Sequence, residues 1–188
     1  MDGRDRMIIE ELLEDGRRPL MKIAERMGIS VMAVKKRLER LLKDGIIRIS
    51  PEVNARKMNL LLAIVAIEIE DSESLEKFLE KFRECPRIIK FFVTTSGFNL
   101  FALIYAEDLS SLESISLEKC SLRSQKGIRR FEIYPVQEIH YDPYLRLKVV
   151  AEKRDENAPC GVYCGDCRRY MDERCLGCPA TSFYRGKL

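Results

Sequence analysis

Hydrophobic residues in the first fifty positions recur at the spacing of amphipathic helices. Three such runs follow one another with short joints, and each gathers its apolar residues on one side of a helix. The first run ends near Gly16, the second begins at Pro19, and Gly28 permits a tight turn before the third. The apolar residues of the three runs are Ile8, Ile9, Leu12 and Leu13; Leu20, Ile23, Ala24 and Met27; and Val34, Leu38 and Leu41.

The third run carries the signals of a recognition helix. Ser30 is a suitable N-cap, and Ile29 and Val34 stand at the positions of a hydrophobic staple. The run stops near Gly45, and "IIRIS" (46–50) reads as a short strand. Three short helices followed by a strand predict a winged helix-turn-helix over residues 1–50, a motif that places its last helix in the major groove of DNA.

The face of this third helix that points away from the predicted core is basic. We expect Met32, Lys36 and Arg40 nearest the base edges, and Lys35, Arg37 and Lys43 nearer the phosphates. Double-stranded DNA is therefore the expected partner. A small helical bundle with a merely solvated basic face is the alternative. The candidate DNA-contacting residues are Ser30, Met32, Lys35, Lys36, Arg37, Arg40 and Lys43.

Residues 60–140 alternate between strand and helix patterns. Apolar, β-branched runs at 60–70, 88–95, 100–106 and 128–136 predict strands. Two helices lie between them, the first capped by Asp71 or Ser72 and the second by Asp108. The order strand-helix-strand, repeated twice, predicts an α+β fold: a ferredoxin-like βαββαβ domain with an antiparallel sheet. Residues 51–59 are then a connecting segment.

The strands of this predicted sheet are apolar in near-continuous runs. A sheet with one face in water should alternate apolar and polar residues. Because two helices can cover only one face, we expect the other to pack on a second copy of the chain. The sequence therefore predicts a homodimer or a higher homo-oligomer.

Composition and charge narrow the classes of function. The net charge of +3 at pH 7 is too small to mark the whole chain as a nucleic-acid binder, so a basic footprint must be local. The longest apolar run is far shorter than the roughly 18 residues of a membrane span, and the start "MDGRDR" does not resemble a secretory signal. We expect a cytoplasmic protein without a membrane partner. The high content of charged residues, 34%, is typical of heat-adapted proteins.

The first 140 residues show no combination of residues that is typical of catalysis. There is no His/Asp/Ser arrangement and no glycine-rich phosphate loop, and His140 is the only histidine of the chain. We expect His140 to lie at the surface, and we interpret Cys85 and Cys120 as packing residues with inert thiols. The sequence predicts no enzyme.

Five of the seven cysteines stand within residues 160–178. A charged linker, residues 141–158, precedes a cysteine-rich module at 159–188. The spacing C-x3-C-x2-C-x7-C-x2-C contains two C-x2-C knuckles, with Gly165 and Gly177 inside them to allow tight turns. Because so short a segment cannot bury enough apolar surface to fold alone, a metal would stabilise it. Disulfides are the alternative, and an odd number of cysteines argues against them.

The spacing leaves two metals open. Cys164, Cys167, Cys175 and Cys178 suit zinc, which is the favoured metal and leaves Cys160 as a spare, redox-sensitive thiol. Alternatively, Cys160, Cys164 and Cys167 repeat the spacing that holds three irons of a [4Fe–4S] cluster in radical-SAM enzymes. The tail contains no histidine, so we expect a structural or sensory site rather than a catalytic one.

Two stretches resemble the Lrp/AsnC (feast/famine) family of transcription regulators. They are "IAERMGISVMAVKKRLERLLKDGIIR" (23–48) and "TTSGFNLFALIYAED" (94–108), and the resemblance covers about residues 1–140. It implies an N-terminal part that binds DNA, and a second part that dimerises through its sheet, builds larger rings and often binds an amino-acid effector. The tail resembles a small cysteine-rich domain that is usually supposed to bind zinc.

The turn that the resemblance connects with the effector is Gly97, Phe98 and Asn99 in this chain. The family commonly has an aspartate close after the glycine, whereas Asn99 offers no carboxylate for the ammonium group of a ligand. We therefore expect a sequence-specific DNA-binding regulator, responsive to metal or redox state through its tail. The alternative is a metalloprotein or an enzyme, of the AsnC-like haem-biosynthesis or iron–sulfur type, with a relic helix-turn-helix.

Overall fold

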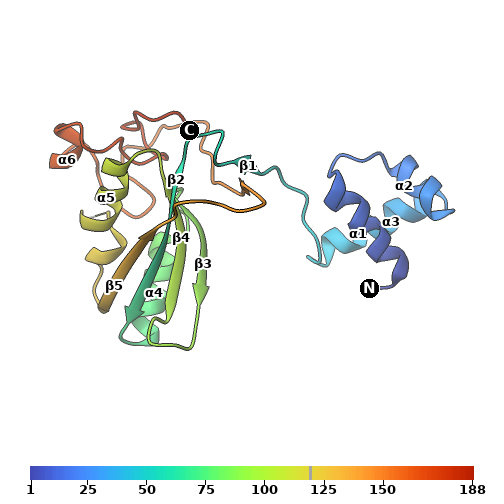
Figure 1. Cartoon of the computed structure of the whole chain (residues 1–188), viewed down its shortest axis with the longest axis horizontal. Coiled ribbons are helices and arrows are strands. Elements are labelled where there is room, and N and C mark those ends of the chain that lie inside the picture. The colour runs from blue at the N-terminus through green and yellow to red at the C-terminus, as the bar shows by residue number, and fades with distance from the viewer. Residues whose placement is uncertain (119) are drawn as a thin grey trace. The chain divides into compact units, whose positions relative to one another are not determined.

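The computed structural model describes residues 1–118 and 120–188. The chain divides into two compact units, Met1–Pro51 and Glu52–Leu188 (Figure 1). Each unit has a hydrophobic core of its own. Within the described residues, no helix is both long and apolar enough to cross a membrane.

Three helices form the N-terminal unit. They are α1 (Gly3–Glu14), α2 (Leu20–Met27) and α3 (Val31–Lys43). Gly28 ends α2 in the left-handed conformation, with φ +62°, as the tight turn between α2 and α3 requires. The buried residues Ile8, Ile23, Ala24, Val34 and Leu41 come from all three helices and form the core. The predicted helix-turn-helix is therefore formed.

The strand predicted at residues 46–50 is not formed. The N–H groups of Ile46 and Ile47 both donate to the carbonyl oxygen of Leu41, at 3.0 and 3.3 Å, and so close the end of α3. Ile47 also packs on the helical core. This backbone turns back onto the helix, so Ile47 is used for packing and the segment pairs with no strand among the described residues.

Four antiparallel strands and two helices build the second unit. The strands are β2 (Leu61–Ile69), β3 (Ile88–Val93), β4 (Leu100–Ala106) and β5 (Ile128–Pro135), in the order β3-β4-β2-β5. The helices are α4 (Ser72–Phe82) and α5 (Leu109–Leu117). Asp71 and Asp108 cap them by accepting bonds from the N–H groups of Ser74 and Ser111. This order and connectivity are those of the predicted ferredoxin-like sheet.

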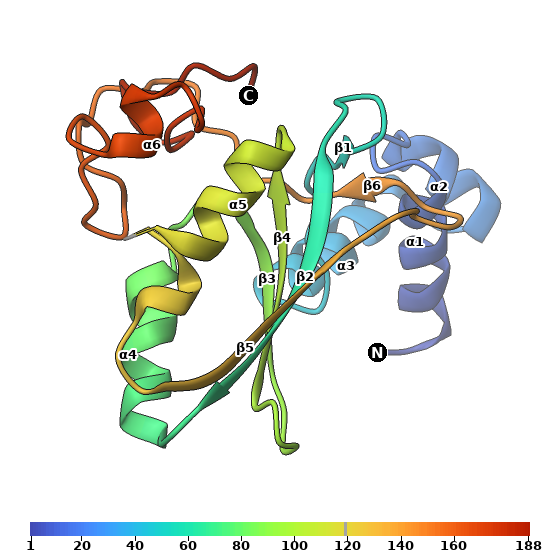
Figure 2. The ribbon, with the colours of Figure 1, turned by 60° about the vertical axis from the view of Figure 1, so that its left-hand side comes forward.

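Both helices cover the same face of the sheet (Figure 2). Phe78 and Phe82 of α4 and Leu112 of α5 pack against inward-facing strand residues such as Val65 and Ile104. These five side chains are almost completely buried. The core of the second unit therefore lies between the helices and one side of the sheet.

A two-stranded ribbon lies outside the main sheet. β1 (Val53–Asn54) pairs antiparallel with β6 (Tyr144–Leu145), with Val53 opposite Leu145. β6 falls within residues 141–158, the segment that the sequence suggested as a linker. The ribbon brings together the segments that enter and leave the sheet domain.

The cysteine-rich tail packs on the sheet domain and belongs to the same compact unit. It contains the short helix α6 (Arg168–Met171), and both views place it beside one end of α5 (Figures 1 and 2). Arg169 of α6 donates to Ser114 Oγ of α5 at 2.8 Å, and the N–H of Leu176 donates to Ser111 Oγ at 3.4 Å. Ser111 and Ser114 are each 1% exposed, so the tail covers these polar groups.

Candidate functional site

α3 presents one buried and one solvent-facing side. Ser30 Oγ accepts a bond from the N–H of Ala33 at 3.2 Å, which is the predicted N-cap. Val34 and Leu41 are completely buried, whereas Met32 is 70% exposed. Lys35, Lys36 and Lys43 are also exposed. The solvent-facing side is therefore apolar near its start and basic along its length.

Arg37 and Arg40, two of the candidate DNA-contacting residues, form ion pairs with carboxylates of residues 2–5. Arg37 Nη1 lies 2.7 Å from Asp2 Oδ2 and 2.8 Å from Asp5 Oδ1, and Arg40 Nη2 lies 2.7 Å from Asp5 Oδ2. The Asp5 carboxylate is completely buried in α1, and these guanidinium groups of α3 compensate its charge. The Arg37 side chain is 24% exposed and that of Arg40 is 52% exposed. Arg37 therefore joins α3 to α1, while Arg40 keeps half of its surface in solvent.

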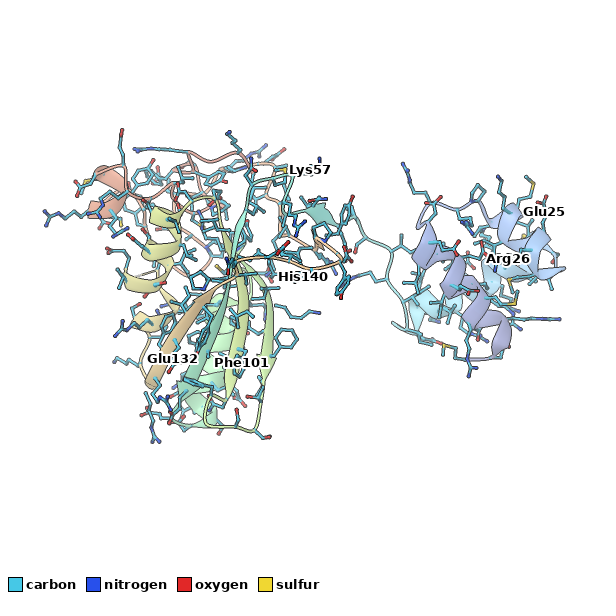
Figure 3. All side chains as sticks on the ribbon, viewed as in Figure 1. Glu25, Arg26, Lys57, Phe101, Glu132 and His140 are labelled. Carbon is cyan, nitrogen blue, oxygen red and sulfur yellow. The ribbon has the colours of Figure 1, made fainter. Side chains whose placement is uncertain are left out.

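These contacts keep the acidic groups of α1 ionised. The N–H of Asp5 and the Arg37 guanidinium lower the pKa of Asp2 to about 2. The N–H of Asp2, together with Arg37 and Arg40, lowers the pKa of Asp5. Glu11 is also buried, and its ion pairs with Arg18 and Arg26 lower its pKa; Figure 3 labels Arg26 on α2. The helical core thus contains two ionised, paired carboxylates.

Polar side chains fix the candidate effector turn, both within the turn and to the neighbouring strand β2. Asn99 Oδ1 accepts a bond from the N–H of Ile69 at 2.9 Å, and Asn99 Nδ2 donates to the Ile69 carbonyl oxygen at 2.7 Å. Thr94 Oγ1 donates to the Phe98 carbonyl oxygen at 2.6 Å, and the Arg130 guanidinium lies 4.6 Å from the centre of the Phe98 ring. The Asn99 amide is therefore engaged in fixing the end of β4 to β2, while Gly97 has no close neighbour.

All seven cysteines of the chain line one cavity of about 280 Å³. Five of them, Cys160, Cys164, Cys167, Cys175 and Cys178, come from the tail. The other two come from the sheet domain: Cys85 follows α4 and Cys120 follows α5. No three cysteine, histidine, aspartate or glutamate side chains among the described residues are gathered closely enough to hold a single ion.

Cys85 packs against the core of the sheet domain, as predicted, and Cys85 and Cys120 also line the cavity together with the tail thiols. They stand far ahead of the cysteine-rich segment in the sequence, so no spacing pattern connects them with it. They line the same cavity as the tail cysteines only because the chain folds so that the segments after α4 and α5 lie beside the tail.

Arg87 connects the second knuckle of the tail to the sheet domain. Its Nη2 donates to the Gly177 carbonyl oxygen at 2.9 Å, and its Nη1 pairs with Glu107, which also accepts a bond from the Tyr184 hydroxyl at 2.5 Å. Gly177 has φ +81°, and a Cβ atom there would lie 2.8 Å from the Phe183 carbonyl oxygen. The knuckle therefore requires glycine at this position.

The first knuckle also contains a glycine, in a different setting. The N–H of Cys167 donates to the Cys164 carbonyl oxygen at 3.1 Å, which closes the turn. A Cβ atom on Gly165 would lie 2.6 Å from the Tyr163 ring. A larger residue at this position would displace that exposed ring, whereas the backbone itself is not left-handed.

Burial raises the pKa of several thiols that line the cavity. The pKa of Cys85 rises to about 11, and those of Cys120 and Cys178 rise to about 12. As free thiols these groups are protonated at neutral pH, and a bound metal would have to displace their protons.

His140 lies at the surface, as expected. Its side chain, labelled in Figure 3, is 74% exposed, and Nε2 lies 3.8 Å from Glu138 Oε2. It does not line the cysteine cavity.

Comparison with known families assigns the two units separately. Residues 1–48 match a family model described as winged helix-turn-helix DNA-binding, and residues 62–144 match one described as the Lrp/AsnC ligand binding domain. The matched residues include α3 and the turn at 97–99, but both matches end before the cysteine-rich tail.

Curated relatives are named as transcription regulators. The HTH-type transcriptional regulator LrpA of Pyrococcus horikoshii is 31% identical over 120 residues, which cover 63% of this chain and 85% of LrpA. The regulatory protein AsnC of Haemophilus influenzae is 23% identical over 124 residues, or 65% of this chain and 83% of AsnC.

Solved structures share the fold. The structure of E. coli AsnC gives a TM-score of 0.68 at 19% identity and covers 76% of this chain and 95% of its own. The leucine response regulatory protein LrpA of Mycobacterium tuberculosis gives a TM-score of 0.66 at 23% identity and covers 76% of this chain and 97% of its own.

Proposed function

The chain belongs to the Lrp/AsnC family of DNA-binding transcription regulators, and on this premise we propose that the exposed side of α3 reads the operator and that the cysteine-rich tail makes the regulator respond to metal or redox state. The names of the curated relatives are those of regulators and not of enzymes. The observation that supports the reading role of α3 is its exposed side: Met32 is 70% exposed, and Lys36 is exposed and has no side-chain hydrogen bond or ion pair among the described residues.

In this proposal the residues of α3 divide into two groups. Met32 and Lys36 approach base edges, and Lys35 and Lys43 approach phosphates. Arg40 can also approach base edges, because half of its side chain is exposed, and its ion pair with Asp5 orients the guanidinium group. Arg37 contributes indirectly, because its contacts with Asp2 and Asp5 hold α3 on α1.

Measurement of DNA affinity tests this division. Operator fragments selected by the protein itself supply the specific DNA, and scrambled fragments supply the non-specific DNA. Lys36→Ala should weaken specific binding by about 1–3 kcal/mol and relax sequence preference. Lys43→Ala should weaken both kinds of DNA alike and reduce the salt dependence by about one charge. Lys77→Ala, on the exposed side of α4 in the other unit, is the control. Unchanged binding in both α3 variants would move the interface elsewhere.

The uncovered face of the sheet supports a homodimer or a higher homo-oligomer. The strand register aligns Leu103, Ile64 and Tyr134 in one row across β4, β2 and β5, and Phe92 and Phe101 in another across β3 and β4. Ile64 is 43% exposed, Phe92 51% and Tyr134 49%. Apolar rows of this kind are suited to burial against a second copy. A dimer would present two α3 helices to a palindromic site.

An effector is the third part of the proposal. The candidate contacts are Gly97 and the Phe98 backbone, because the Asn99 amide is already bonded to Ile69. One structural relative, a regulator of Neisseria meningitidis, is described as a complex with L-Met. Calorimetric titration of this protein with amino acids, in wild type and in Gly97→Val, tests whether the turn takes a ligand of that class. Heats that are unchanged by the substitution would exclude it.

The response to metal or redox state rests on the five tail cysteines that line one cavity. The test compares the DNA affinity of metal-loaded protein with that of protein stripped by a chelator under reducing conditions. We expect the two affinities to differ by several-fold, since the loaded and stripped tails would pack differently on the sheet domain. Equal affinities would make the tail a purely structural module.

A further inference from the structure

The cavity places every thiol of the chain around one space. Its lining combines the tail with apolar side chains of the sheet domain, including Phe82, Ile88 and Leu122. Cys85 and Cys160 pack against the same hydrophobic core. Cys160 is therefore part of the lining and in contact with the sheet domain, not a thiol left over at the edge of the tail.

The arrangement differs from that of a closed zinc site. Four thiolates about 2.3 Å from one zinc ion lie within about 4 Å of one another. Among the described residues no such group of three or more ligands exists. The thiols instead surround a space of about 280 Å³, which is larger than a single ion fills.

We infer that this cavity binds a polynuclear iron–sulfur cluster, with Cys160, Cys164 and Cys167 as three of its ligands and another cysteine of the lining as the fourth. A cubane [4Fe–4S] cluster is held by four thiolates, which bind its outer corners and so stand farther apart than the ligands of one ion. The other four cysteines that line the cavity offer the fourth ligand: Cys85, Cys120, Cys175 and Cys178.

The surroundings suit a cluster with a negative charge. Arg87 is 7% exposed, lines the cavity and holds the Gly177 carbonyl oxygen next to Cys178. The rest of the lining is largely apolar, and its other charged residues are Glu118, Asp166 and Arg168. A buried cation and a largely apolar lining are features that tune such clusters and limit the access of water to them. This inference rests on the proposal that the tail binds a metal, and it names the metal group.

Metal analysis of the full-length chain is the first test. The protein is purified without oxygen from cells supplied with iron, and iron, acid-labile sulfide and zinc are measured together with the visible spectrum. We expect about four irons and four sulfides per chain, with broad visible absorbance that bleaches on reduction. About one zinc per chain and no iron would overturn the inference while leaving a metal-binding tail.

Substitution of Cys160 separates the two metals. A cluster held by Cys160 should be lost in Cys160→Ser, whereas a zinc site made of the other four tail cysteines should survive. Ser182→Ala is the matched control, because Ser182 is an exposed tail residue outside the cavity lining. Loss of iron in the control as well, or retention of iron in Cys160→Ser, would overturn the assignment.

Four further variants identify the remaining ligand. Of Cys85→Ser, Cys120→Ser, Cys175→Ser and Cys178→Ser, one should lose the cluster as Cys160→Ser does. If all four keep it, the fourth cysteine ligand does not exist and the inference fails. DNA binding by the same preparations distinguishes this inference from the proposed function, since a brown protein without DNA affinity would contradict only the reading role of α3.

Discussion

Asp2 and Asp5 place two carboxylates at the start of the chain, and Arg37 binds both of them. The folded pKa of Asp2, about 2, lies below its ordinary value of 3.8, so folding favours the ionised form. The stability that follows is complete above about pH 4 and is lost as the pH falls through about 2. The pKa of Asp5 is shifted in the same direction.

The first prediction concerns this loss. Thermal unfolding followed by circular dichroism between pH 2 and 7 should show a fall in melting temperature below about pH 4. Asp2→Asn should have a lower melting temperature than wild type at pH 7 and a flatter dependence on pH, because the group that titrates is gone. Asp44→Asn, at the exposed end of α3, is the control and should keep the wild-type slope. The same slope in Asp2→Asn would contradict the assignment.

The second prediction concerns Gly177. Gly177→Ala forces a side chain into a left-handed backbone, which costs about 1–2 kcal/mol, and it brings Cβ to 2.8 Å from the Phe183 carbonyl oxygen. Chemical denaturation should show a loss of at least that size. Gly97→Ala is matched as a control, since a Cβ atom there has no neighbour within 4 Å and its φ lies outside the left-handed region. A fully stable Gly177→Ala would show that the knuckle can change its conformation.

At the scale of elements, the sequence predicts those features that neighbouring residues decide. Ser30, Asp71 and Asp108 cap helices because each reaches an N–H group three residues ahead. The four strands of the sheet follow from β-branched apolar runs and lie close to their predicted bounds. The predicted strand at 46–50 is not formed, because an alternating pattern of apolar residues does not supply a second strand to pair with, and the N–H groups of Ile46 and Ile47 bond to Leu41 instead.

Features that depend on distant residues were not predictable. The ribbon of β1 and β6 pairs Val53 with Leu145, and nothing near either residue indicates the other. The ion pairs of Arg37 and Arg40 with Asp5 also join residues that are far apart in the sequence. The sequence showed only that Asp5 stands three residues before the buried Ile8, and so on the side of α1 that faces the core. For the candidate site, the spacing identified the five tail cysteines, while Cys85 and Cys120 joined them only through tertiary packing.

The third prediction concerns the docking of α6 on α5. Arg169 donates to Ser114 Oγ and pairs with Glu113 Oε2 at 2.9 Å, and its side chain is 13% exposed. Arg169→Ala should cost about 1–3 kcal/mol, because a charge-assisted bond is lost and the buried Ser114 hydroxyl loses a donor. Limited proteolysis should then cut the tail sooner, within residues 159–188. Arg168→Ala removes the neighbouring side chain, which is 90% exposed, and should leave the cleavage rate unchanged. Equal rates in both variants would contradict the docking role.

At the scale of the whole molecule, the fourth prediction concerns assembly through the uncovered sheet face. Phe92→Glu places a charge within the apolar row of β3 and β4, so it should raise the dissociation constant of the dimer at least about tenfold, or about 1.4 kcal/mol. Light scattering at micromolar concentration measures this. Leu109→Glu is the control, because Leu109 is 67% exposed on the helix-covered side. A monomeric wild type, or equal shifts in both variants, would exclude this face as the interface.

The shared lining of the cysteine cavity also has a consequence for the order in which the protein is made. Residues 52–144 are made before residues 145–188, so the sheet domain can begin to fold before the tail is available to cover it. At about 5–20 residues per second, synthesis of these 44 further residues takes about 2–9 seconds. Until the tail packs, the side of the cavity that carries Cys85, Cys120 and Phe82 faces solvent without its cover. A nascent chain is then open to whatever delivers a cofactor, and equally to oxidants and to chaperones that bind apolar surface. The tail closes this opening only after its own residues have left the ribosome.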